Sequence, residues 1–240
     1  MPATSQTAAG EIRTPRERAR AQTIADIIRL GRQHLAEHGA AALSLRAVAR
    51  DLGVVSSAVY RYVASRDELL TLLLVDAYND LGDAVDAAVE PVPAEDFGGR
   101  FAALARAVRG WALREPARYG LLFGSPVPGY QAPAERTTAP GTRVVNTLVQ
   151  ILDAAHRAGR LAERGPSAVP APLAADLEAI RRELNVEVPG ALLARGTLVW
   201  TSLFGAVSFE VFGQYGAGTF FAPDELFEHH IALLADLAGL

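Results

Sequence analysis

Four side chains in one short stretch of the sequence have the chemistry needed to contact a nucleic acid. They are Ser56, Ser57, Tyr60 and Arg61. Tyr60 and Arg61 have the reach to bind phosphates or base edges, and Arg can bind guanine through two hydrogen bonds. Small side chains at Ser57 and Ala58 permit a close approach to DNA. A helical hairpin in any all-α protein could show the same spacing, so spacing alone leaves both interpretations open.

Two short helices joined by a tight turn, over residues 44–63, would position these side chains. In the first helix, apolar residues recur at intervals of three or four: Leu45, Val48, Ala49 and Leu52. Ser44 stands at its N-cap position, where the hydroxyl can accept a hydrogen bond from an amide near Arg46. Gly53 follows Leu52, and a glycine can adopt the left-handed backbone conformation that ends a helix at little cost. The pattern favours a helix-turn-helix whose second helix, with Ala58, Val59 and Tyr62 inward, enters the major groove.

The run from Ala42 to Leu70 resembles the N-terminal domain of TetR-type transcriptional regulators. The matching residues are Gly53-Val54 at the turn, Tyr60-Arg61-Tyr62-Val63 at the end of the recognition helix, and the capping box Ser65-Arg66-Asp67-Glu68 before two leucines. This resemblance implies a helix-turn-helix domain that binds double-stranded operator DNA. The DNA-contacting positions it implies are Ser44, Arg46, Val55, Ser56, Ser57, Ala58, Tyr60, Arg61, Tyr62, Ser65 and Arg66.

Three residues depart from the pattern of this family. Val55 replaces the usual Ser or Thr, which leaves the cap of the recognition helix open between Val55 and Ser56. Val63 replaces a common Phe and leaves less volume under that helix. Arg66 replaces a Lys that usually touches phosphate, and it keeps the positive charge.

Composition indicates a globular chain, and 240 residues permit one or two domains with a sizeable core. No cysteine is present, which excludes disulfides and thiolate metal sites. We expect a cytoplasmic protein that does not cross a membrane, because the first ten residues lack an apolar signal core and no long stretch is uniformly apolar. Up to Leu70, ten Arg oppose seven acidic residues, a charge of +3; the rest of the chain carries −7, for a net charge of −4. This asymmetry suits one domain that faces a nucleic acid and one that does not.

No catalytic or metal-binding motif is recognisable, so we expect no enzymatic activity, no cofactor and no bound metal. His34 and His38 are four residues apart, which is a metal-ligand spacing, but no carboxylate motif accompanies them. Two exposed surface histidines are the expected alternative. His229 and His230 are adjacent and diverge on a helix, so they cannot chelate one ion together.

The sequence predicts an all-α protein in three segments: a flexible arm over residues 1–14, a DNA-binding domain over 15–90 and a regulatory and dimerisation domain over 91–240. Arginines at the start of the first helix could contact a phosphate or the minor groove, or could simply be solvated. The first helix is predicted from Pro15 to His38 and the fourth from Arg66 to about Val89. Helices of the second domain are predicted over 97–111, 116–123, 144–155, 173–184, 191–212 and 223–237.

The second domain resembles one branch of TetR-type C-terminal domains. The matching residues are Glu115-Pro116-Ala117-Arg118-Tyr119, Leu122-Phe123-Gly124 and Pro126-Val127-Pro128-Gly129-Tyr130. That branch carries a Trp-His-Gly signature in a late buried helix, where this chain has Trp200, Phe204 and Gly205, so the His of the signature is lost. The resemblance implies a bacterial one-component regulator, usually a repressor, that forms a homodimer through its last two long helices.

The same resemblance implies a pocket for a small molecule in the second domain. Its candidate lining residues are Trp111, Tyr119, Phe123, His156, Trp200 and Phe204. Plain core packing is an equal alternative for each of them, and His156 could instead cap a helix end near Gly159. If these residues do line a pocket, we expect an apolar or aromatic effector. A ligand-independent regulator, or a helical partner-binding protein without DNA affinity, remains the alternative function.

Overall fold

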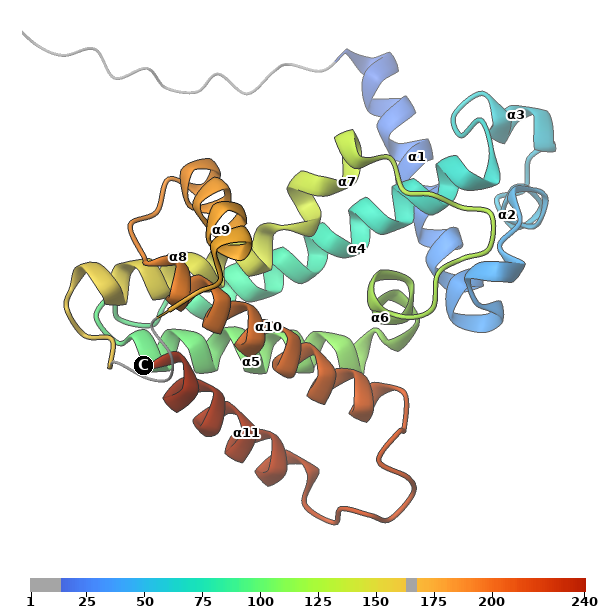
Figure 1. The fold of residues 1–240 in the computed structure, drawn as a ribbon. Helices are drawn as coiled ribbons and strands as arrows, with labels where there is room; N and C mark the ends of the chain where they lie inside the picture. Colours follow the sequence, from blue (N-terminus) through green and yellow to red (C-terminus); the bar gives the residue numbers. More distant parts are fainter. Residues whose placement is uncertain (1–13, 163–167) are drawn as a thin grey trace, which may run out of the picture. The chain divides into compact units, whose positions relative to one another are not determined.

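The computed structural model describes residues 14–162 and 168–240, and within these ranges every regular element is helical (Figure 1). The all-α prediction is therefore confirmed. Packing divides the chain into two compact units, one that ends at Leu73 and one from Leu74 to Leu240. This division lies inside α4 (Arg66–Val89), whereas the domain boundary predicted after residue 90 coincides with the end of that helix.

The first unit contains α1 (Pro15–His38), the 3₁₀ turn η1 (Ala40–Ala42), α2 (Leu45–Asp51), α3 (Ser56–Tyr60) and the first turns of α4. Helix α1 begins with a full capping box, in which Thr14 and Glu17 each accept a hydrogen bond from the other's backbone amide. It ends at Gly39, whose φ of 75° favours glycine. The buried apolar side chains of this unit are Ile27, Leu30, Leu35, Leu43, Leu45, Val48, Ala49, Val59, Val63, Leu69, Leu70 and Leu73.

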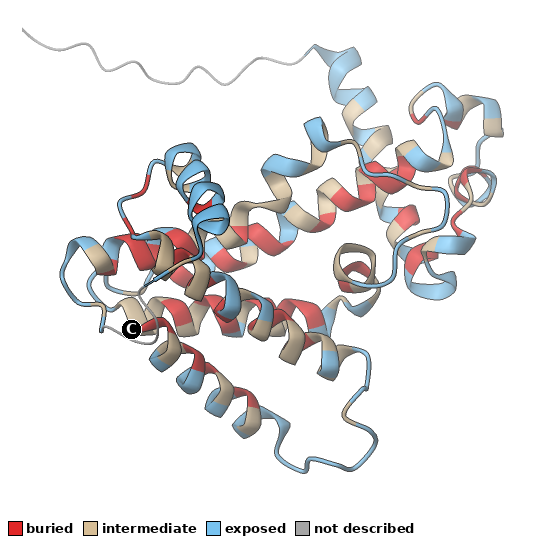
Figure 2. Ribbon diagram, in the orientation of Figure 1, coloured by how far each residue is buried: buried red, intermediate tan, exposed pale blue. Residues whose placement is uncertain are grey.

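The second unit is built from the part of α4 after Leu73 and seven further helices. These are α5 (Phe97–Arg114), α6 (Pro116–Phe123), α7 (Ala134–Gly141), α8 (Arg143–Arg157), α9 (Ala171–Leu184), α10 (Gly190–Val211) and α11 (Pro223–Ala238). Helix α10 packs against α5, α8, α9 and α11, and buried residues line its inner side (Figures 1 and 2). By length and composition alone α10 could span a membrane. On its inner side Val199, Leu203 and Val207 are fully buried in the core, whereas Leu198 and Phe209 on its outer side are exposed.

The predicted periodicity does not include α7. This helix is mostly polar, has no buried residue and contains Pro140, so no apolar stripe announces it. It is stabilised locally, because the Thr137 hydroxyl donates to the carbonyl of Pro133. Gly141 also lies against the ring of Tyr78, close enough that any larger residue would crowd that ring.

A buried carboxylate holds the segment between α9 and α10. Asp153 of α8 is fully buried, and its Oδ1 accepts hydrogen bonds from the backbone amides of Glu187 at 2.6 Å and Val188 at 2.8 Å. Its other oxygen pairs with Arg157. Burial by itself would raise the pKa of Asp153, but the hydrogen bonds from Arg157, Val188 and Glu187 together lower it. Asp153 is therefore a charged anchor for this linker.

Replacing Asp153 with Ala should destabilise the second unit. The buried amide of Val188 loses its acceptor, and such a loss costs about 1–3 kcal/mol. Urea unfolding followed by circular dichroism measures the change. As a control, Asp176→Ala removes an exposed carboxylate of α9 and should change the stability by less than about 0.5 kcal/mol. Equal effects of the two substitutions would show that Asp153 is not an anchor.

Candidate nucleic-acid interface and cavities

The turn between α2 and α3 has the geometry that the sequence predicts, but the caps differ. Gly53 has a φ of 74°, which lets the chain reverse after Leu52. Ser44 has the extended backbone of an N-cap, yet its hydroxyl caps no amide in the described chain, so the predicted side-chain cap is wrong. Val55, not Ser56, precedes α3, again without a side-chain cap. Water can satisfy the first amides of helices that begin at an exposed surface.

Helix α3 presents its polar residues to the surface because two valines fix its other side. Val59 and Val63 are buried, whereas Ser57, Tyr60 and Arg61 are exposed. Ser56, Ala58 and Tyr62 lie half-buried at the edges, so Ala58 and Tyr62 contribute less to the inner face than predicted. Tyr60 keeps 45% of its surface exposed, so its ring and hydroxyl are accessible to a partner.

Two arginines brace this helix-turn-helix within the first unit. The guanidinium of Arg20 on α1 lies 5.3 Å from the ring centre of Tyr62, a distance at which a cation is attracted to the ring face. Arg66 donates hydrogen bonds from Nη2 to the carbonyls of Ala40 at 2.9 Å and Ala41 at 3.1 Å. The guanidinium of Arg66 therefore fixes the start of α4 against η1, a role that its sequence position did not indicate.

At the start of α4, the hydrogen bond that the predicted capping box assigns to the side chain of Ser65 is present. The hydroxyl of Ser65 accepts a hydrogen bond from the amide of Glu68 at 3.0 Å. Ser65 and Arg46 are exposed, and Ser44 is half-buried. Together with the residues of α3 they complete the predicted set of DNA-contacting positions.

His34 is not the exposed histidine that the sequence predicts. It is 9% exposed, and its Nε2 lies 2.6 Å from Oδ2 of Asp51 at the end of α2. A carboxylate can only accept, so Nε2 carries the hydrogen. Packing against α2 buries His34, while His38 one turn later stays exposed. No group of three or more potential metal ligands occurs among the residues that the structure describes.

The aromatic candidates of the second unit form one packed cluster. Trp111, Tyr119 and Phe204 are buried, and Phe123 and Trp200 are half-buried. The Tyr119 hydroxyl lies 2.8 Å from the Ser208 hydroxyl and donates to the Phe204 carbonyl at 3.2 Å. Burial raises the pKa of Tyr119, partly offset by the bond with Ser208. Tilted ring contacts join Tyr119 to Phe123, Phe123 to Phe204 and Phe204 to Trp200.

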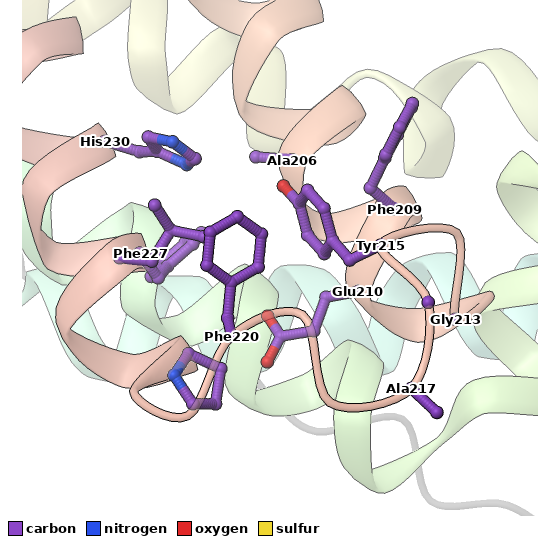
Figure 3. A pocket seen from close by; sticks show the side chains of 12 residues that line it. Ala206, Phe209, Glu210, Gly213, Tyr215, Ala217, Phe220, Phe227 and His230 are labelled. Carbon is purple, nitrogen blue, oxygen red and sulfur yellow. The ribbon is translucent and has the colours of Figure 1, made fainter.

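Two of the hollows in the described part of this unit adjoin α10. One, of about 410 Å³, is formed by the end of α10, the following loop and the start of α11. Figure 3 shows Phe220, Phe227 and Tyr215 around it, with the Glu210 carboxylate at its edge. Glu210 makes two 2.6 Å contacts with Arg109 and is therefore already neutralised. The other hollow, of about 280 Å³, lies between α8, α9 and α10.

Of the six candidate pocket residues, Trp200 lines the 280 Å³ cavity. Trp111 instead donates from Nε1 to Asp80 at 2.9 Å and belongs to the core. His156 lies half-buried near the end of α8.

Two family models match the chain. The model of bacterial regulatory proteins of the tetR family matches residues 27–73, and the model of the tetracyclin repressor-like C-terminal domain matches residues 101–234. The HTH-type transcriptional regulator Rv1816 of Mycobacterium tuberculosis is 50% identical over 221 residues, which cover 91% of this chain and 93% of that relative. The chain belongs to the TetR family. It is accordingly a helix-turn-helix transcriptional regulator that binds DNA, and not an enzyme.

Solved structures of other proteins share this TetR fold. The regulatory protein SCO4313 is 36% identical, with a TM-score of 0.75, and the match covers 93% of this chain and 100% of that one. The TetR family transcriptional regulator PfmR from Thermus thermophilus is 18% identical with a TM-score of 0.55, over 95% of this chain and 97% of that one. At this lower identity the likeness shows the fold alone.

Stability of the TetR N-terminal unit should depend on Asp51 below about pH 4. Its pKa is lowered, chiefly by the hydrogen bond with His34 and next by that with Arg50. This contribution is therefore fully present above the ordinary Asp pKa of about 3.9, and it is lost as the pH falls through the lowered folded-state value. We expect Asp51→Asn to make the unfolding temperature fall less steeply as the pH is lowered below about 4, and thermal unfolding at a series of pH values measures this. We expect Asp26→Asn on α1 to leave that dependence on pH unchanged.

Proposed function

We propose that the protein is a repressor that binds a near-palindromic operator as a homodimer and releases it on binding a small apolar or aromatic effector in the cytoplasm. The observation that carries the DNA-reading part is the surface of α3, where Ser57, Tyr60 and Arg61 are exposed above buried Val59 and Val63. A recognition helix held in this way can enter the major groove with its polar side chains first.

Arg61 and Tyr60 have distinct roles in this proposal. Arg61 is exposed, and its guanidinium can bind guanine or a phosphate. Tyr60 adds a hydroxyl at similar reach. Ser57 and Ala58 are small enough for the α3 backbone to approach base edges. Arg46 and Ser65, on neighbouring helix starts, would contact phosphates and set the position of α3 on the duplex.

Substituting Tyr60 and Arg61 with Ala should weaken specific DNA binding. Each lost base contact costs about 1–3 kcal/mol, so the double variant should lose at least about tenfold in affinity. The operator is first recovered by selection from randomised double-stranded DNA, and affinities are then measured by fluorescence anisotropy at fixed salt. Arg114→Ala removes an exposed Arg of the second unit and serves as the control. Unchanged affinity of the double variant would leave a partner-binding helical protein as the better description.

The outer face of α10 and α11 supports the homodimer. Ser202, Gly205 and Ala206 form a floor of small side chains on α10, and Phe209 and Leu233 border a groove of about 400 Å³ above it. Phe209 is 47% exposed and Leu233 54% exposed, which is costly for a face open to water. Two copies of this helix pair would bury each other's grooves as a four-helix bundle. A two-fold dimer would space two recognition helices one DNA turn apart, roughly 34–36 Å.

Replacing Leu233 with Glu should convert the protein to monomers. A carboxylate in the centre of the proposed interface would be buried without a partner, which is strongly unfavourable. Analytical ultracentrifugation gives the mass of the complex, and affinity for a full operator should fall with dimer content. Leu173→Glu places the same charge on a similarly exposed leucine of α9 and should leave the dimer intact. A variant that stays dimeric would place the interface elsewhere.

A further inference from the structure

The cavity between α8, α9 and α10 borders the aromatic cluster at Trp200. Its volume is about 280 Å³, and most of its wall is aliphatic. Val145 and Leu152 contribute from α8, Leu177 and Ile180 from α9, and the Trp200 side chain from α10. At about 30 Å³ for each water in the liquid, this space corresponds to a molecule on the order of ten non-hydrogen atoms. That size matches one aromatic ring with substituents, or two fused rings.

We propose that this cavity binds a planar ring compound that is neutral or cationic, with α9 as its cover. The inference deepens the effector part of the proposed function and rests on it for the regulatory consequence, but the binding itself does not depend on DNA. The site would hold the ring between aliphatic side chains of α8 and α9 and the face of Trp200.

The polar groups of the wall define the charge of the ligand. Asn146 offers an amide, Thr197 a hydroxyl and Glu183 a carboxylate, while no basic side chain occurs among the described residues that line the cavity. An anion would lose water without gaining a positive partner, and it would lie near Glu183. An amine or hydroxyl on the ring could donate to Glu183 or Asn146. A cation could also lie over the indole face of Trp200.

Helix α9 is attached in a way that allows it to act as a cover. Leu177 is its buried residue, whereas Leu173 and Ile180 are each 43% exposed. Leu177 packs in a small cluster with Val149 and Val188, apart from the main core of the unit. Asp153 fixes only the linker after α9 to α8. A shift of α9 would therefore open the cavity without disturbing the main core.

Trp200 connects the cavity to the rest of the unit. Its ring centre lies 4.1 Å from that of Phe204, which lies 4.6 Å from Phe123. Phe123 in turn lies 6.3 Å from Tyr78 on α4. A ligand that moves Trp200 would press on a continuous row of rings that ends on α4. That row gives the proposed site a physical route to the helix whose first turns belong to the DNA-binding unit.

Isothermal titration calorimetry with two probes that share the naphthalene ring and differ in charge tests the proposal on the full chain. 1-Naphthylamine is neutral at pH 7 and 1-naphthoate is an anion. We expect 1-naphthylamine to bind at least tenfold more tightly, and Glu183→Gln to narrow that difference. Val145→Trp should fill the cavity and reduce 1-naphthylamine affinity at least tenfold. Thr197→Phe, at the exposed rim, should do the same where Val145→Trp does not fold. Asp176→Asn, on α9 outside the cavity, should change affinity less than twofold.

Three results would contradict the proposed site. They are no binding of 1-naphthylamine, equal affinity for both probes, or unchanged 1-naphthylamine affinity in a folded Val145→Trp or Thr197→Phe variant. Operator affinity is measured separately on the same preparations. Retained operator binding with no probe binding would defeat only this inference. If 1-naphthylamine binds with the expected variant effects but selection recovers no specific operator sequence, the proposed function is contradicted and the proposed site is supported. Release of a recovered operator by 1-naphthylamine, absent in the filling variant, supports the regulatory use.

Discussion

The second unit depends on one buried cation. Arg118 is 4% exposed, and its guanidinium donates to Asp80 at 2.6 Å and to Asp76 at 3.0 Å, both on α4. The same guanidinium lies over the ring of Trp111, whose indole also donates to Asp80. The side chain of Asp76 is 19% exposed and that of Asp80 48% exposed, so Arg118 is the charge that would be left desolvated if these carboxylates were removed. The short helix α6 is thereby fixed to both α4 and α5.

Fixing α6 determines the packing of α10. Tyr119 follows Arg118 directly, and Phe123 lies one turn further along. Their rings meet Phe204 of α10 and Phe212, the residue directly after α10, because the Arg118 ion pairs hold α6 against α4. The Phe204 that replaces the signature His adds an aromatic ring where the family branch has a polar group. The result is a solid row of rings rather than an open pocket at that point, and free volume is found beyond Trp200 instead.

Sequence patterns predict the long helices because their ends carry local signals. Pro15 and Gly39 bound α1, and Pro91 follows α4, so the observed limits of both helices agree with the prediction. Tertiary pairs have no such signal. His34 and Asp51 are 17 residues apart, and Arg109 and Glu210 are 101 residues apart. Periodicity cannot bring such partners together, which is why the sequence predicts His34 as exposed and Arg66 as a phosphate contact alone.

The division of the second unit into a main core and a small outer cluster has an energetic consequence. A ligand shifts an equilibrium only by its difference in affinity for the two states, typically about 1–3 kcal/mol in regulatory coupling. Moving a helix of the main core would expose many fully buried side chains at about 25 cal/mol per Å², which exceeds that range. Moving α9 exposes little beyond Leu177 and its few neighbours. A cavity covered by α9 is thus one that a molecule of about ten non-hydrogen atoms has enough binding energy to control.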